Sequence, residues 1–197
     1  MNLEKEITVM ISCDYETLKE ELRKEGFQEK GTYEVHDTYM MDQTIDLKAF
    51  EKLDLLQNCI LVRDIVGIEK SLLYKDKKYA KNGDILEQKK IKCPISDCEK
   101  AIQFMNAIHY KCLFEIHDSC TVYANEKTEL TIQQVNDEYL FLEIEDLVDT
   151  MDAKYSSIEE MIQDLESYHL SYDKSNYFVK KALIMLEKTL REKKEKL

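Results

Sequence analysis

Two segments of this chain carry glutamates spaced two residues apart. Glu4 and Glu6 lie near the start of the sequence, and Glu143 and Glu145 lie in the stretch YLFLEIED. Because side chains alternate along a β-strand, each pair points to one face, and the opposite face is largely apolar. Oxygen ligands of this kind suit a hard divalent cation. The alternative interpretation, a solvated face of an edge strand, needs no ligand.

Composition narrows the classes of protein to consider. The chain has 197 residues with 44% hydrophobic and 35% charged residues, which favours one folded domain over a disordered chain. Its net charge of −12 disfavours binding to nucleic acid or to an anionic membrane surface. No apolar run approaches the roughly 20 residues of a membrane span, and no signal peptide is visible.

The six cysteines show no zinc-ligand spacing. We therefore expect reduced, mostly structural thiols in a cytoplasmic protein, and regard a disulfide network as the less favoured alternative.

Hydrophobic periodicity and turn signals predict strands broken by a few helices. Asp14 is expected to cap a first helix that ends at Gly26. Ser96 with Glu99, and Ser156 with Glu159, are expected to form capping boxes for later helices. A short helical or irregular crossover is expected at 46–56, and a final helix around 177–190. Strands are expected at 3–12, 35–42, 59–66, 69–79, 85–93, 111–117, 119–125, 128–135 and 140–146.

This order predicts an α+β fold. We expect a closed or nearly closed antiparallel eight-stranded β-barrel, a tunnel with flanking helices, because closure removes the edges of a sheet. An eight-stranded barrel can hold a small ligand when its lining is polar. The whole of 1–197 is expected to be a single domain, with 156–197 as its C-terminal helical part.

Several segments match, in order, the motifs of a known family. EKEIT at 4–8 is similar to a Glu-x-Glu-x-Lys strand without its lysine, and Asp37-Thr38-Tyr39 matches an Asp-x-Tyr motif. FLEIE at 141–145 matches a closing strand, and LSY at 170–172 is similar to a helical Ser-Tyr motif. The chain thus resembles the CYTH domain superfamily, the triphosphate tunnel metalloenzymes, and most of all the class IV adenylate cyclase branch.

Other motifs of the family are weakened here. The family's Leu-Arg-Ile-Arg and Leu-Thr-Tyr-Lys strands resemble ILVR at 60–63 and LLYK at 72–75, which keep Arg63 and Lys75. The Arg-x-Glu-x-Glu strand falls on 85–89 and keeps Glu87, while the Lys-x-Arg strand falls near His117 with no strong cation left. The basic set is therefore degenerate relative to the family's pattern.

The resemblance implies a site inside the barrel. Its metal ligands would be Glu4, Glu6, Glu87, Glu143 and Glu145, holding Mg²⁺ or Mn²⁺. Its substrate-binding residues would be Arg63, Lys75, Lys89 and His117; no catalytic residue is identified. A triphosphate carries about four negative charges at neutral pH, and few basic residues remain to hold it. We therefore expect the chain to have retained cation binding better than triphosphate turnover.

For single residues the ordinary alternatives stay open. The alternative interpretation of Arg63 is a salt-bridge partner only. That of Lys75 is part of a solvated lysine-rich hairpin, and that of His117 is a structural histidine. Lys70 and Lys89 are candidate replacements for lost cations, and the sequence does not decide whether they point inward.

Three functions follow as hypotheses. The first is an enzyme, either a metal-dependent triphosphatase or a class IV adenylate cyclase-like phosphorus–oxygen lyase. The second is a non-catalytic relative that binds a metal, a polyphosphate or a cationic small molecule. The third is an interaction protein. A phosphorylated small molecule is the expected partner, and a homodimer stays open.

Overall fold

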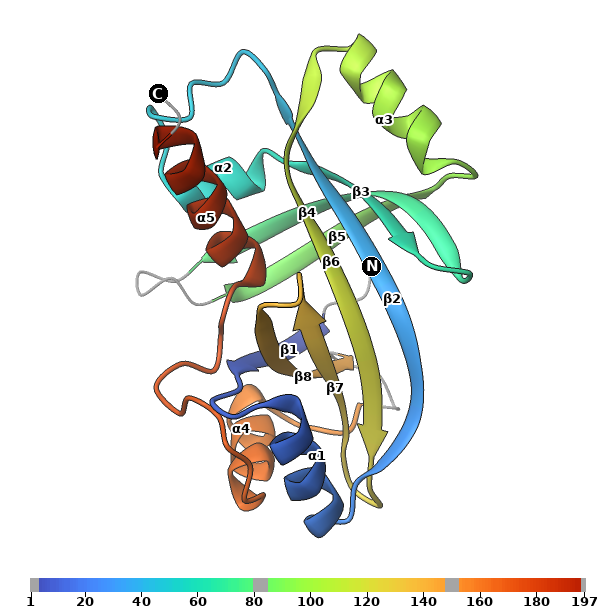
Figure 1. Ribbon diagram of the computed structural model, residues 1–197, viewed down its shortest axis with the longest axis vertical. Helices are drawn as coiled ribbons and strands as arrows, with labels where there is room; N and C mark the ends of the chain where they lie inside the picture. The colour runs from blue at the N-terminus through green and yellow to red at the C-terminus, as the bar shows by residue number, and fades with distance from the viewer. Residues whose placement is uncertain (1–3, 80–84, 148–152, 196–197) are drawn as a thin grey trace. The chain divides into compact units, whose positions relative to one another are not determined.

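The structure is a computed structural model, and it describes the residues 4–79, 85–147 and 153–195, with the side chains of 4, 76–79, 85–88, 147 and 193–195 outside that description. The strands form one eight-stranded sheet in the order β1-β8-β7-β6-β2-β3-β4-β5 (Figure 1). Their bounds are β1 Glu4–Met10, β2 Gln28–Asp42, β3 Ile60–Ile65, β4 Glu69–Tyr79, β5 Ile85–Pro94, β6 Tyr110–Ala124, β7 Glu129–Val135 and β8 Tyr139–Leu147.

The expected α+β class and the count of eight antiparallel strands are confirmed. The two strands expected at 111–117 and 119–125 are one continuous strand, β6. The strand expected at 35–42 begins seven residues earlier, at Gln28. The expected hairpin at 125–127 is confirmed, because Asn125 N–H donates to the carbonyl of Thr128 at 2.9 Å.

Closure of the barrel by hydrogen bonds is not found among the described residues, because β1 and β5 are the terminal strands of the sheet. The reason lies at the outer edge of β1. Thr8 N–H donates to Tyr177 O at 2.9 Å, and Val179 N–H donates to Thr8 O at 3.0 Å. Ser12 N–H donates to Ser171 O at 3.0 Å. The edge that closure would need is therefore occupied by the segment 171–179.

This segment also corrects the expected start of the last helix. Tyr177 and Phe178 were expected in a helix around 177–190, but Phe178 forms a parallel bridge with Thr8. Tyr172 lies in the core cluster of the described residues and Tyr177 packs against it, with their ring centroids 6.2 Å apart. The final helix begins at Lys181.

Five helices are described, and short polar side chains cap the N-termini of three of them, α1, α3 and α4. Asp14 caps the first as expected, accepting from Thr17 N–H at 2.9 Å. The two expected capping boxes are wrong by one residue, since Asp97 and Ser157 are the caps. A serine directly precedes each of these caps, and serine is itself a favoured N-cap residue, which explains the error of one position. The bounds are α1 Tyr15–Lys24, α2 Lys52–Gln57, α3 Cys98–Ala107, α4 Ile158–Ser167 and α5 Lys181–Glu195.

The chain divides into two compact units that are interleaved in sequence. The first unit comprises Met1–Tyr33, Tyr79–Glu87 and Asp118–Val179, and the second comprises Glu34–Lys78, Gln88–His117 and Lys180–Leu197.

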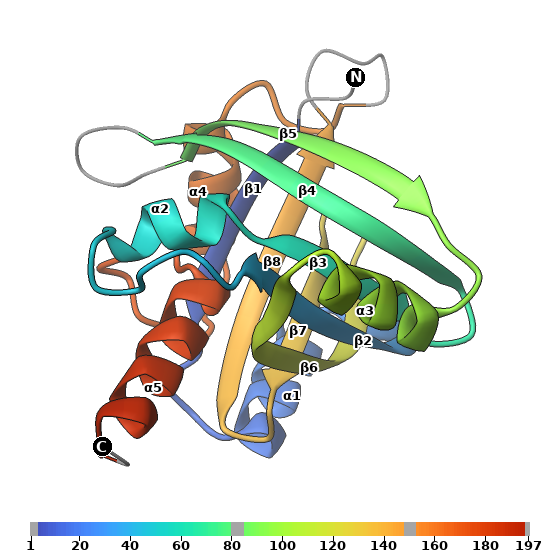
Figure 2. The same cartoon turned by 90° about the horizontal axis from the view of Figure 1, so that it is seen from above.

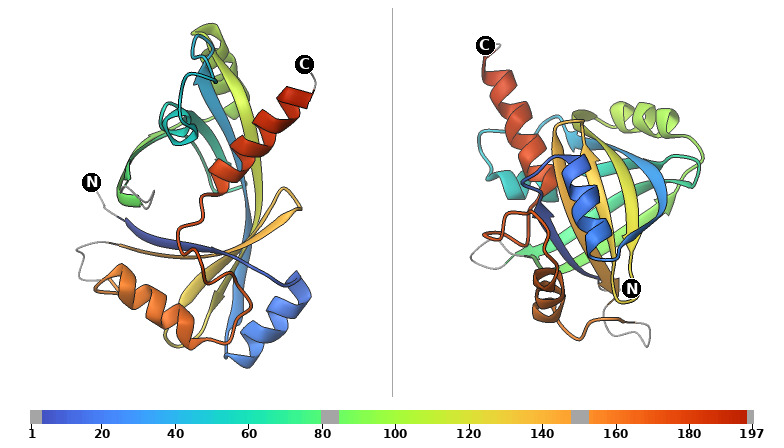
Figure 3. Two further views of the ribbon diagram at one scale, coloured as in Figure 1. Left: turned by 90° about the vertical axis from the view of Figure 1, so that its left-hand side faces the viewer. Right: turned by 60° about the horizontal axis from the view of Figure 1, so that its bottom comes forward.

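In the first unit, α1 and α4 lie on the same side of β1 and β8 (Figure 3). Leu18 and Leu22 of α1 and Met161 and Leu165 of α4 are fully buried in one core cluster. The strands contribute to this cluster the residues Ile7, Val9, Leu130, Ile132, Leu142 and Ile144. Since side chains alternate along a strand, the glutamates next to these residues lie on the face away from the helices.

In the second unit, α3 covers one face of β2 and β3. Met105 of α3 packs with Met40 and Val62. Helices α2 and α5 lie side by side (Figures 1 and 2), joined by an ion pair of 2.6 Å between Lys52 Nζ and Glu187 Oε1. None of the helices in the described part of the chain combines the length and the apolar character needed to cross a membrane.

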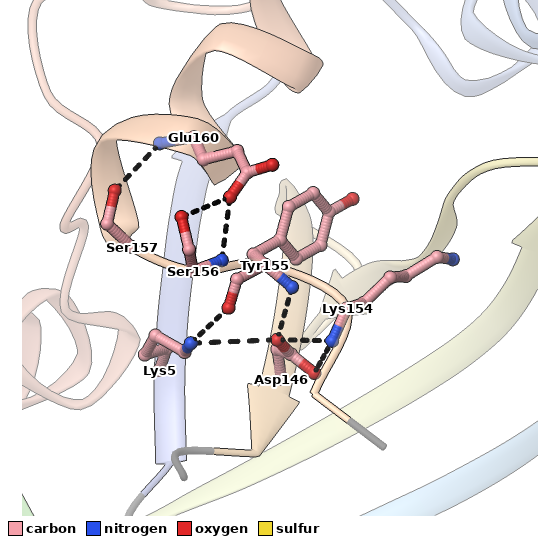
Figure 4. A network of polar contacts seen from close by, with 7 residues as sticks. All are labelled: Lys5, Asp146, Lys154, Tyr155, Ser156, Ser157 and Glu160. Atoms are coloured by element: carbon pink, nitrogen blue, oxygen red, sulfur yellow. Dashed lines mark hydrogen bonds and ion pairs between the residues drawn. The ribbon is translucent and has the colours of Figure 1, made fainter. Parts of the chain in front are cut away.

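A polar network fixes the chain entering α4 to the ends of β1 and β8 (Figure 4). Asp146 Oδ2 accepts hydrogen bonds from the backbone N–H of Lys154 at 3.0 Å and of Tyr155 at 2.9 Å. Lys5, the register partner of Asp146, donates to the carbonyl of Tyr155 and lies 3.8 Å from the carboxylate. Three of the residues that flank this pair in sequence, Glu4, Glu6 and Glu145, are candidate site residues.

We predict that Asp146→Ala lowers the free energy of unfolding by about 1–3 kcal/mol, because two backbone N–H groups lose their acceptor. Urea denaturation measures this loss. Glu126→Ala, in an exposed turn, is the control and should change stability by less than about 0.5 kcal/mol. Equal effects of the two substitutions would contradict the structural role of Asp146.

Candidate functional site

The first unit brings three of the predicted glutamates onto one face of adjacent strands. Antiparallel pairing places Glu6 opposite Glu145 and Thr8 opposite Glu143. Residues opposite each other have Cβ atoms about 5 Å apart, and like charges in that position destabilise a sheet. Glu6 and Glu143 are partly buried, Glu145 is exposed and Thr8 is only 3% exposed. We call this set the carboxylate face; a divalent cation would relieve its repulsion.

Tyr33, from β2, adds a polar group beside the carboxylate face. Burial, then the neighbouring Cys120 and Glu143, raise the pKa of Tyr33 to about 12. Its hydroxyl also hydrogen-bonds with Thr131, which is the register partner of Glu143 on β7. At neutral pH Tyr33 is therefore an uncharged O–H donor held next to a carboxylate.

Gln133 lies one register step further along the same face. It is 5% exposed and pairs with Phe141 on one side and Cys120 on the other. Its Oε1 accepts no hydrogen bond from any described residue. A buried carbonyl oxygen without a hydrogen-bond donor is uncommon in folded proteins. It indicates either a polar ligand at this position or a cost in stability.

A preformed metal cluster is not present among the described residues, since no three of their His, Cys, Asp and Glu side chains gather closely enough. The side chains of Glu4 and Glu87, predicted as ligands, lie outside the described residues. The donor chemistry of Glu6, Glu143 and Glu145 nevertheless fits Mg²⁺ or Mn²⁺, which prefer carboxylate oxygens and retain water ligands.

The second unit places Arg63 in a two-pronged ion pair. Its Nε donates to Asp37 Oδ1 at 2.7 Å and its Nη2 to Asp37 Oδ2 at 2.5 Å. The two residues are register partners on β2 and β3, and the Asp37 side chain is 5% exposed. Arg63 therefore forms a salt bridge, as its alternative interpretation expected. Whether Arg63 also binds a substrate stays a prediction.

Ser71 and Lys75 share the face of β4 that lies next to Arg63. Ser71 is the register partner of Arg63, is fully buried, and its Oγ has no hydrogen-bond partner among the described residues. Alternation along β4 puts Lys75 on the same face, partly buried. Lys70 instead pairs with Asp64 at 3.0 Å on the opposite face, and this carboxylate raises the pKa of Lys70. The sequence did not decide which way Lys70 points; in the structure it faces away from Arg63.

His117 lies on the other face of its strand from the buried Ile116. Its ring is exposed and stacks on His36 with a centroid distance of 4.5 Å. Asp37 follows His36 directly and so points to the opposite side. Lys89 is partly buried on β5. The substrate-binding roles of His117 and Lys89 stay predictions.

Sequence reasoning missed the uncharged members of both faces: Tyr33, Cys120, Thr131, Gln133 and Ser71. Asp37 was quoted within a motif but given no role in a site. Residues of these types are common in β-strands and do not by themselves indicate a site. They come together only through the register between paired strands, which a single sequence does not specify.

No family model matches the chain, and no curated protein matches it in sequence. Solved structures match it in fold. The PH1819 protein of Pyrococcus horikoshii OT3 superposes with a TM-score of 0.65 at 20% identity, covering 94% of this chain and 99% of that one.

Two further matches have names that refer to an activity. A proposed adenylate cyclase of Vibrio parahaemolyticus has a TM-score of 0.59 at 11% identity, over 96% of this chain and 98% of that one. The adenylyl cyclase candidate HpAC1 of Hippeastrum, described as having a dominant triphosphatase activity, has a TM-score of 0.58 at 12% identity, over 95% and 96%. At these identities the likeness shows a shared fold and no more.

Proposed function

We propose that this chain is a CYTH-like protein that binds a divalent metal, Mg²⁺ or Mn²⁺, through Glu6, Glu143 and Glu145, and a phosphorylated small molecule through that metal. The observation that carries the proposal is the cross-strand pairing of Glu6 with Glu145 on the face of β1 and β8 opposite the one that packs against α1 and α4. Two adjacent carboxylates repel each other, and a bound divalent ion removes that repulsion.

The metal would neutralise phosphate charge and orient the phosphoryl group. The residues of this chain would hold the metal, and Tyr33 would donate a hydrogen bond beside it. Arg63, Lys75, Lys89 and His117 are kept as proposed contacts to the phosphorylated ligand, as are Glu4 and Glu87 to the metal. A metal-dependent triphosphatase or an adenylate cyclase-like lyase is the enzymatic form of this proposal.

The second candidate is a non-catalytic binding module for a metal, a polyphosphate or a cationic small molecule. It is favoured by the ion pair of Arg63 with Asp37, which neutralises the one arginine retained from the family's pattern. With that charge compensated, fewer cations are left to stabilise the charge that develops when a phosphoanhydride breaks.

Saturating Mn²⁺ is predicted to raise the melting temperature of the wild-type chain by about 5–10 °C, the shift expected at a hundredfold excess over Kd for a chain of this size. The double variant Glu143→Gln and Glu145→Gln should lose this shift, because two ligand charges are gone. Thermal melting with and without EDTA measures both.

The matched control is Glu16→Gln with Glu20→Gln, which removes the same charge from the exposed surface of α1. It should keep the Mn²⁺ shift. If the site variant responds to Mn²⁺ as the control does, the carboxylate face is not the metal site.

Catalysis separates the two candidates. The enzymatic form predicts release of phosphate or pyrophosphate from ATP or tripolyphosphate in the presence of Mn²⁺, lost when EDTA is added and in the Glu143→Gln/Glu145→Gln variant. Release that persists in both would come from a contaminant. Binding of Mn²⁺ without release of either product would select the binding module.

A further inference from the structure

The side chain of Gln133 carries a buried carbonyl oxygen that lacks a hydrogen-bond donor among the described residues. Gln133 is only 5% exposed, and its Oε1 accepts no hydrogen bond there. Its neighbour Ile132 belongs to the core cluster that packs against α1 and α4, as does Leu142 next to Glu143. Because side chains alternate along a strand, Gln133 and Glu143 both lie on the opposite face. The acceptor without a donor is therefore part of the polar face of the first unit.

Thr131 and Glu143 supply two further oxygen acceptors close to this carbonyl. They are register partners on β7 and β8, and the Cβ atoms of such partners lie about 5 Å apart. Gln133 is the register partner of Phe141, so it lies diagonally from Glu143, at a separation of about 7 Å that long side chains span. One small group placed between the three side chains can therefore hydrogen-bond with all of them.

The hydrogen bonds already made by Thr131 and Glu143 leave room for another donor. Burial raises the pKa of Tyr33 to about 12, whereas its hydrogen bond with Thr131 lowers that pKa, as a bond donated to the phenol oxygen does. The lone pairs of the Thr131 hydroxyl are not used in such a bond. A carboxylate has about four lone-pair positions, so Glu143 can accept a further N–H beside its other contacts.

The three acceptors fit one kind of cation in charge and in number of donors. Together they carry one formal negative charge, that of Glu143. A primary ammonium group has one positive charge and three N–H donors, each reaching an oxygen at about 2.9 Å. A divalent ion would leave a positive charge in excess at a buried position, which is costly. The low exposure of Gln133 also favours a slender ligand over a bulky one.

We propose that Gln133, Thr131 and Glu143 form a subsite for a small primary amine in its ammonium form, with each side chain accepting one N–H. The inference rests on the second candidate function in so far as the ligand is a cationic small molecule. It adds the chemical class of that ligand and the residues that recognise it. Glu143 also belongs to the proposed metal site, so the subsite is tested without metal.

Thermal melting in EDTA with methylammonium chloride tests the subsite. At a tenfold excess over Kd, methylammonium should raise the melting temperature of the wild-type chain by about 3–6 °C. Tetramethylammonium has the same charge without an N–H donor, and potassium is a monatomic ion of the same charge. Their chlorides at the same concentration should leave the melting temperature unchanged. Equal shifts with the three salts, or no shift over a methylammonium titration, would overturn the proposal.

The variant Gln133→Met removes the buried acceptor and keeps a side chain of similar length. It should bind methylammonium at least about tenfold more weakly than wild type, as expected for the loss of a hydrogen bond to a charged group. Gln134→Met is the matched control, because Gln134 is the next residue of β7, is partly buried and points to the other face. It should keep the wild-type shift. A wild-type response in Gln133→Met, or an equal loss in both variants, would contradict the assignment.

The stability of Gln133→Met without amine gives an independent readout. The substitution breaks no hydrogen bond of Oε1 and removes an acceptor that is costly to bury, so the variant should melt at the wild-type temperature or above it. Melting below the wild-type temperature would mean that an internal water already satisfies the carbonyl, and the amine subsite would be rejected.

The amine subsite and the metal site can fail separately. A methylammonium shift in EDTA together with no Mn²⁺ response of the wild-type chain would sustain the amine subsite and reject the proposed metal function. A Mn²⁺ response with no methylammonium shift would do the reverse.

Discussion

The register between β1 and β8 is the constraint on which the candidate site depends. Ile7 and Val9 face the helices together with Leu142 and Ile144, so the residues between them face the other way. A slip of one residue would bury Glu6 under α1 and α4 and expose the core. The apolar contacts that stabilise the first unit are therefore the same contacts that bring the carboxylates together, even though those carboxylates repel one another.

The same division of faces is found in the second unit. Met40 and Val62 pack under α3, which leaves Asp37 and Arg63 on the far side of β2 and β3. Here Asp37 is paired with Arg63, whereas on the carboxylate face Glu6 lies opposite another acid, Glu145. The two polar faces thus differ in the charges that strand pairing sets opposite each other: an acid and a base in one, two acids in the other.

Much of the fold was accessible from the sequence because its signals are local. Alternation predicted β1 and β8, the Asp14 cap predicted α1, and the turn at 125–127 predicted the β6–β7 hairpin. The segment 171–179 was misjudged because its apolar residues also fit a helix, and only a distant partner, β1, makes it extended. For the site, the glutamates were predicted by spacing, but Tyr33, Gln133 and Ser71 depend on strand pairing that one sequence cannot specify.

The bonding of segment 171–179 to β1 has a consequence for how the chain is made. Thr8 and Ser12 leave the ribosome before their backbone partners, Tyr177, Val179 and Ser171, which are synthesised more than 150 residues later. On its other side β1 pairs with β8, which also follows it far along the sequence. Strand β1 must therefore wait, with both edges open, until β8 and the segment 171–179 have been synthesised. Such long-range closure slows folding, and it makes the nascent chain depend on protection of that strand from neighbouring chains.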